Sequence, residues 1–210
     1  MKDSQPYPWP FDGGDAKAID ASRTMVLACG MQQHWLDLAM QGAEATAVHI
    51  CDFVDRCRVG GVAVMWIRHG RARGGHRSID RTLPAVGSEA WSLIALPEPD
   101  DIVIDTPGHD AFLVGWTDVE LRGRGVDKLV LVGIGTETTV NGTLRSANDR
   151  GFECVTLTDA VAHHGCETGA AALSSITMSG GIFGAIGTTV DLLRELESRA
   201  QPTDKGATYE

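Results

Sequence analysis

Residues 128–139, KLVLVGIGTETT, decide the fold class of this chain. The apolar run 128–133 predicts a strand, and the turn Gly133-Ile134-Gly135-Thr136 follows it at once. Residues 137–150 then continue as a helix, which Gly151 ends. A helix that starts at such a turn offers free N–H groups to an oxyanion or a phosphate, and the alternative is a plain tight turn.

Strands and helices alternate on both sides of this segment. Further strands are predicted at 23–29, 62–68, 101–105, 153–157 and, as a short sixth strand, 182–186. Helices are predicted at 43–60, at 117–124 with Thr117 as N-cap, at 167–178, and at 190–199 with Thr188 or Thr189 as N-cap. This alternation predicts a three-layer α/β/α, Rossmann-like fold with a mostly parallel six-stranded sheet. We expect an extended N-terminal arm over 1–22, one domain over 23–199, and a disordered tail over 200–210.

Composition narrows the classes of partner. The net charge of −10 at pH 7 argues against a nucleic-acid groove and against an anionic membrane surface. No apolar run approaches the roughly 18 residues that span a bilayer, and the first residues lack a signal-peptide core. Five cysteines without metal-type spacing indicate reduced thiols in a cytoplasmic protein. We find no dinucleotide or phosphate-loop motif, so no cofactor and no metal are expected.

Several side chains fall where the predicted strands end, which is where ligands of parallel sheets bind. Cys29 is either a nucleophile or a small buried hydrophobe. Arg68 and His69 open a long Gly- and Arg-rich loop over 69–90, which either grips a carboxylate or is a solvated loop. Glu137, in the first turn of a helix, either complements the helix dipole or faces the pocket as an acid/base group.

A set of ordered motifs then carries a family resemblance over about 7–196. The motifs are YPWPFDG at 7–13, MQ at 31–32, VID at 103–105 with Pro107-Gly108, AF at 111–112, VG at 132–133 with Thr136, ANDRGFE at 147–153, and GGIFG at 180–184. Together they resemble the isochorismatase-like cysteine hydrolases. The chain is most similar to the branch that cleaves amides and ureides, which includes biuret hydrolase and ureidoacrylate amidohydrolase.

The resemblance also locates the catalytic triad of that family, Asp, Lys and Cys, and none of the three is present. The family's Asp precedes Met-Gln, where this chain has Gly30. Its Lys follows the third strand, where this chain has Thr106, and its Cys lies three residues after a Thr, where this chain has Thr139. Without base, cation and thiolate, the usual cysteine hydrolysis of amides is not expected.

Two functions therefore stay open. The first is a catalytically degenerate homologue that binds a small ligand, assembles as a homo-oligomer (dimer or tetramer), or joins an active paralogue. The second is an enzyme with relocated acid/base chemistry on a small carbonyl, ureide or vinyl-ether compound. Candidate replacement groups are His69, His109, Asp110, Glu137 and Cys29. The resemblance implies a ligand pocket lined by Trp35, Trp66, Arg68, Ile134 and Gly135.

Overall fold

The structure is a computed structural model that describes residues 19–38, 42–71 and 83–200. The larger part of the expected N-terminal arm, 1–18, lies outside these residues. So do 72–82 of the predicted long loop and 201–210 of the predicted tail.

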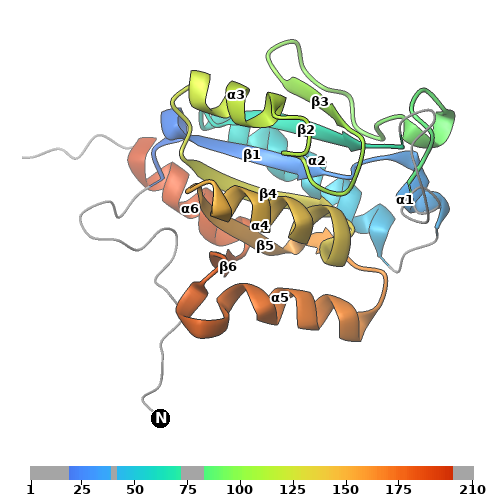
Figure 1. Cartoon of the computed structure of the whole chain (residues 1–210). Coiled ribbons are helices and arrows are strands. Elements are labelled where there is room, and N and C mark those ends of the chain that lie inside the picture. Colours follow the sequence, from blue (N-terminus) through green and yellow to red (C-terminus); the bar gives the residue numbers. More distant parts are fainter. Residues whose placement is uncertain (1–18, 39–41, 72–82, 201–210) are drawn as a thin grey trace, which may run out of the picture.

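A six-stranded parallel sheet forms the middle layer (Figure 1). The strand order is β3-β2-β1-β4-β5-β6, which confirms the predicted α/β class. The strands are β1 (Thr24–Cys29), β2 (Ala63–His69), β3 (Ile102–Thr106), β4 (Lys128–Ile134), β5 (Glu153–Ala162) and β6 (Ala185–Gly187). β5 extends five residues beyond the predicted 153–157, and its pairing with β4 shifts register between Leu131 and Gly133.

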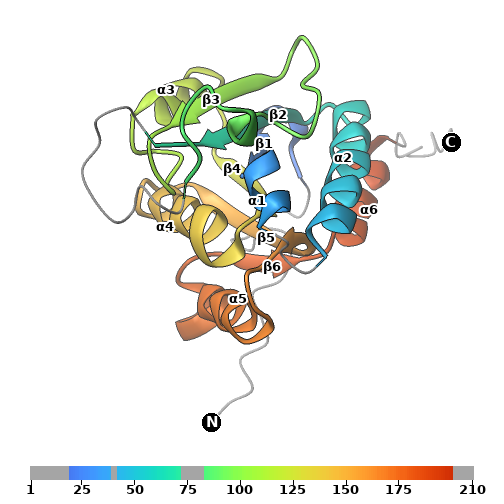
Figure 2. The ribbon, with the colours of Figure 1, turned by 90° about the vertical axis from the view of Figure 1, so that its right-hand side faces the viewer.

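Helices cover both faces of the sheet (Figure 2). On one face lie α2 (Ala43–Val59) and α6 (Thr189–Ala200), and on the other lie α3 (Trp116–Gly123), α4 (Asn141–Asp149) and α5 (Cys166–Gly181). Short helical segments are η1 (Ala21–Arg23), α1 (Gln33–Asp37), η3 (Glu89–Trp91) and the π-helical η4 (Thr136–Val140). None of the helices in the described residues is long and apolar enough to cross a bilayer.

The alternation of side chains along β1 explains why its sequence is apolar throughout. All six residues of β1 are buried. Val26 and Ala28 pack into the core cluster beneath α2 and α6, whereas Met25, Leu27 and Cys29 pack into the cluster beneath α3 and α4. Each buried aliphatic side chain stabilises the fold by roughly 1.5–3 kcal/mol, so β1 and its neighbour β4 anchor both layers.

Helix starts differ in part from the prediction. Thr117 is not the N-cap of α3, because Gly115 occupies that position and the Thr117 hydroxyl donates to the carbonyl of Ala111. For α6 the predicted capping is present: the N–H of Asp191 donates to Thr188 Oγ1, and that hydroxyl donates to the Asp191 carboxylate. The predicted helix 137–150 is divided into η4 and α4.

The chain order places the switch point of the connections in the middle of the sheet. β1 and β4 are adjacent, and the connections that follow them lead to opposite faces of the sheet. Figure 2 looks at this carboxyl edge and shows α1 at its centre, over the end of β1. Open α/β sheets bind ligands at this point.

Candidate small-molecule site

Gly30 follows β1 directly at this switch point. Its φ of +67° lies in the left-handed region that favours glycine. A Cβ added to Gly30 would stand 2.5 Å from the carbonyl oxygen of Ile134, 3.0 Å from Trp35 Nε1 and 3.2 Å from Thr139 Oγ1. Gly30, Trp35, Ile134 and Thr139 therefore meet at one point, and residue 30 has no room there for a side chain.

Thr139 lies on the opposite side of that point, fully buried in η4. Its hydroxyl donates to the carbonyl of Ile134 at 2.8 Å and lies 3.3 Å from the carbonyl of Gly135. Within the described part of the chain, no carboxylate or imidazole is hydrogen-bonded to Thr139 Oγ1. A hydroxyl committed to a carbonyl and without an adjacent base is a weak nucleophile.

Thr106 ends β3, two strands away from β1. Its hydroxyl donates to the carbonyl of Asp110 at 2.8 Å, which closes the turn after β3. The Asp110 carboxylate accepts the N–H of Phe112 at 2.8 Å and the hydroxyl of Ser146 at 2.6 Å. As a candidate replacement group, Asp110 is thus already engaged in holding this turn against α4.

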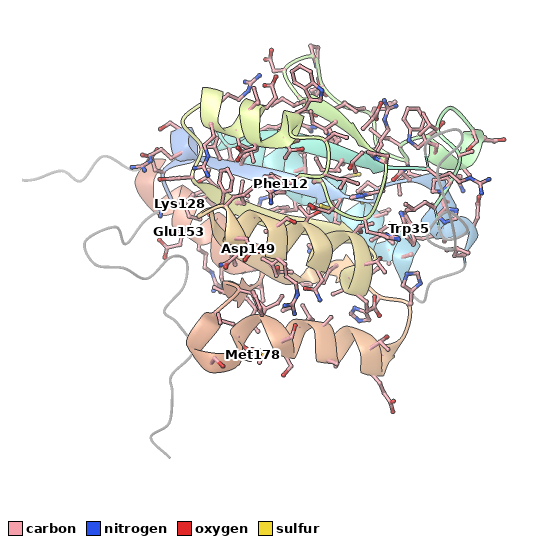
Figure 3. All side chains as sticks on the ribbon, in the orientation of Figure 1. Trp35, Phe112, Lys128, Asp149, Glu153 and Met178 are labelled. Carbon is pink, nitrogen blue, oxygen red and sulfur yellow. The ribbon has the colours of Figure 1, made fainter. Side chains whose placement is uncertain are left out.

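Lys128 does not supply an ammonium group to the site in place of the family's Lys. It is the one lysine among residues 19–38, 42–71 and 83–200. It begins β4 at the amino edge of the sheet, where its ammonium group contacts Glu153 at 2.8 Å. Figure 3 shows Lys128 and Glu153 at the opposite end of the molecule from Trp35.

His69 is fully buried at the end of β2. Its backbone N–H and C=O both pair with the side-chain amide of Gln32, at 2.8 and 3.0 Å. Nδ1 lies 2.8 Å from the carbonyl of Gly108, so Nδ1 carries the proton and Nε2 presents a lone pair. This Nε2 is buried and has no hydrogen-bond partner among the described residues. Burial, with a smaller contribution from His109, lowers the pKa of His69 to about 4, so the imidazole is neutral at pH 7.

Two other candidate groups have structural roles. Cys29 is buried in the core cluster beneath α3 and α4, and this burial raises the pKa of its thiol to about 12, which disfavours the thiolate. The Glu137 carboxylate accepts hydrogen bonds from the hydroxyl of Thr168 at 2.7 Å and from the N–H of His164 at 3.1 Å. These bonds hold the pKa of Glu137 below its usual value against the opposing effect of its partial burial. Glu137 thus ties η4 to the start of α5, a role that the sequence did not predict.

His109 and Trp35 lie near His164, in the segment before α5. Burial, and then the charge of His164, lower the pKa of half-buried His109. The Trp35 ring lies edge-on to the rings of His34 and His164, with centroids 5.0 and 5.5 Å apart. Trp35 is therefore held from two sides at the carboxyl edge of β1.

Trp66 and Arg68, which the resemblance places at the pocket, each have a carboxylate partner in the structure. Trp66 Nε1 donates to Asp101 at 2.7 Å, and since Asp101 precedes β3, this indole leans toward the amino end of the sheet. Arg68 pairs with both oxygens of Asp105, at 2.6 and 3.0 Å, and stacks on Trp91 with its guanidinium carbon 3.8 Å from the ring centroid. Both side chains meet these carboxylates because β3 runs alongside β2.

Among the described residues, no group of three or more His, Cys, Asp or Glu side chains is arranged to hold a metal ion.

The sequence did not predict the role of the Gln32 side chain, whose amide nitrogen donates to the carbonyls of His69 and Trp91. The Met31-Gln32 pair in the family motif was the available signal.

Comparison with known proteins places the chain in a family. Residues 24–189 match the isochorismatase domain. Ureidoacrylate amidohydrolase RutB of Methylorubrum extorquens is 30% identical over 176 residues, which cover 68% of this chain and 71% of that protein. The RutB protein of Azorhizobium caulinodans is 28% identical over 211 residues, which cover 84% and 92% of the two chains.

Solved structures agree with this fold. A cysteine hydrolase from Pseudomonas syringae superposes with a TM-score of 0.77 at 22% identity, over 90% of this chain and 98% of that one. The pyrazinamidase of Pyrococcus horikoshii, determined in complex with zinc, gives a TM-score of 0.70 at 20% identity over 79% and 99% of the two chains. The matched domain, the RutB relatives and the shared fold together establish that this chain belongs to the isochorismatase family of hydrolases.

Proposed function

We propose that this chain is a catalytically degenerate family member that binds a small molecule at the carboxyl ends of β1 and β4. One observation carries the proposal: residue 30, which corresponds to the family's Asp by resemblance, is a glycine whose Cβ position is 2.5 Å from a backbone oxygen. A base has no place there. The triad equivalence at Gly30, Thr106 and Thr139 rests on the resemblance.

The hydrogen bonds of the two threonines support the same proposal. Thr139 and Thr106 both donate to backbone carbonyls, those of Ile134 and Asp110. Loss of a nucleophile and its base together typically removes several orders of magnitude of rate. What remains at these positions are two hydroxyl groups bonded to the backbone and the Trp35 indole, which favours binding over bond cleavage.

The test is to incubate the purified full chain with ureidoacrylate, biuret and nicotinamide and to measure ammonia release. A RutB protein assayed in parallel is the positive control. We expect no turnover above the buffer rate. Ammonia release that disappears in the Thr139→Ala variant would overturn the proposal.

The alternative, relocated acid/base chemistry, is favoured by His69 alone. Its buried, neutral imidazole keeps a lone pair on Nε2 that no described residue uses, as a general base requires. If His69 were such a base, His69→Asn would abolish a turnover that Thr139→Ala leaves intact.

Assembly into a homo-oligomer also belongs to the proposal. Leu113, Trp116 and Val119, on α3 and the turn before it, expose apolar side chains, with Trp116 65% accessible. A second copy of this chain would cover them. Light scattering should then give a multiple of 22.4 kDa, and a clean monomer would contradict assembly.

A further inference from the structure

The surface around α5 has no charged side chain over a long stretch of sequence. Residues 168–190 contain no Asp, Glu, Lys or Arg, although these make up 22% of the chain. The stretch forms most of α5, all of β6 and the start of α6. It is nevertheless exposed in part, since Met178 and Ile182 are 51% and 53% accessible. Exposed apolar surface without charge is typical of a face that another protein covers.

The other two long helices have the usual charged surface. The exposed residues of α2 and α6 include Glu44, Asp52, Asp55, Arg56, Arg194 and Glu197. After its first turn, α5 exposes only Ala, Ser, Met and Gly. Side chains as small as Ala and Ser lose little rotamer entropy when they are buried, and they allow two helices to pack closely. The exposed side of α5 is therefore suited to contact with another helix.

The exposed residues of α5 lie on one side of the helix. Ala171, Ser174 and Met178 are separated by three and four residues, which is the spacing of neighbours along one helix face. The N–H of Ile182 donates to the carbonyl of Met178 at 3.2 Å, so Ile182 follows one turn later. The stripe thus continues past the end of the regular helix.

The edge strand β6 extends this surface. α5 packs against β6, and Ala185 of that strand packs toward the core cluster beneath α2 and α6. Since side chains alternate along a strand, Ile186 points to the other face of the sheet, which α5 covers. Figure 3 shows Met178 at the outer margin of the molecule. We call the exposed residues Ala171, Ser174, Met178, Ile182 and Ile186 the α5–β6 face.

We propose that the α5–β6 face is a two-fold interface with a second copy of this chain. Two copies that each carry a net charge of −10 repel one another, and this repulsion is least where neither surface has a charge. A two-fold contact brings the same residues of both copies together, which an uncharged face tolerates and a face with charges of one sign does not. A partner that is recognised by its charge would find no counter-charge here.

This contact goes beyond the assembly through α3 that belongs to the proposed function. Figure 1 shows α3 and α5 at opposite margins of the fold, so the two contacts can form independently. Together they would build a tetramer, whereas either one alone would build a dimer.

The first test places a charge in the middle of the stripe. Ala171→Glu should raise the dissociation constant of the contact about a hundredfold or more, because the two-fold axis brings two unpaired carboxylates into it. Sedimentation of the full chain at several concentrations should then give half the wild-type mass. Ala45→Glu is the matched control, because Ala45 is also an exposed helical alanine but lies on the charged surface of α2, and its mass should equal that of the wild type.

The second test asks whether residue 171 meets its own copy. Ala171→Lys should dissociate the contact as Ala171→Glu does, and an equal mixture of the two variants should restore the wild-type mass, because opposite charges then meet across the axis. A monomeric wild type would overturn the inference. So would an unchanged mass in both variants, which would leave a different protein or residues 1–18 of the same chain to cover α5. Dissociation without restoration in the mixture would rule out the two-fold contact.

These outcomes are separate from those that test the proposed function. Trp116→Glu tests the contact through α3, and ammonia release from amides tests the proposed lack of turnover. Neither result changes the mass that Ala171→Glu is expected to lose.

Discussion

Substituting Gly30 should be far more costly than substituting another glycine with the same backbone conformation. Gly30 and Gly151 have φ values of +67° and +80°. A Cβ at Gly151 meets nothing within 4 Å, whereas a Cβ at Gly30 lies 2.5 Å from the carbonyl oxygen of Ile134. A residue with a Cβ in the left-handed region costs roughly 1–2 kcal/mol, which both alanine variants incur. Overpacking a filled site adds about 1–3 kcal/mol, which only Gly30→Ala incurs.

Urea denaturation of the two variants measures this difference. We expect the free energy of unfolding to fall by about 1–2 kcal/mol in Gly151→Ala and by about 2–5 kcal/mol in Gly30→Ala, with unchanged m-values. Equal losses in the two variants would refute the crowding of Gly30. The same Cβ is present in Asp, so Gly30→Asp should be no better tolerated, and restoring the family's base would require the turn after β4 to move.

Three further predictions concern the thiols and the buried imidazole. Thr139→Cys should yield no acyl adduct with ureidoacrylate by mass spectrometry, because no base or cation would activate the thiol; an adduct would contradict the described surroundings of Thr139. Exposed Cys166 should react with iodoacetamide in the folded protein, whereas Cys29 should react only after unfolding, and early labelling of Cys29 would show that it is accessible. The pKa of His69 is about 4 in the folded chain and 6.5 in the unfolded chain. The contribution of the neutral imidazole to the free energy of unfolding is therefore present above pH 6.5 and is lost as the pH falls toward 4. This loss amounts to about 3 kcal/mol. His69→Asn should remove this part of the pH dependence of the unfolding free energy, measured by urea denaturation at several pH values. If the dependence on pH is the same in the variant, the imidazole of His69 is exposed to water in the folded chain.

The core elements were predictable because their signals are local. β1 and β4 are continuous apolar runs, and Gly151 ends a helix with a positive φ that glycine adopts easily. The second half of β5 was missed because Thr158 and Asp159 interrupt its apolar pattern and the register shift against β4 leaves no mark in the sequence. A helix as short as α1 has too few turns to produce a period.

The site was predictable only where the resemblance supplied positions. Gly30 and Thr139 lie close together because β1 and β4, which precede them, are adjacent strands. The partners of Glu137 lie 27 and 31 residues away, at His164 and Thr168, and no spacing rule connects them. Trp66 was expected at the pocket because it lies near a strand end, but its orientation depends on Asp101, which becomes its neighbour only once β3 pairs with β2.

The two threonines stabilise the turns at the carboxyl edge of the sheet. Each hydroxyl satisfies a backbone carbonyl, that of Ile134 for Thr139 and that of Asp110 for Thr106, and such bonds contribute about 0.5–1.5 kcal/mol each. A thiol is a weaker donor than a hydroxyl, and a lysine at Thr106 would bring an unpaired charge to a nearly buried position. Stability therefore favours threonine at both positions, whereas cysteine hydrolysis would require the other residues. The proposed function, binding without cleavage, would therefore keep the residues that stabilise both turns.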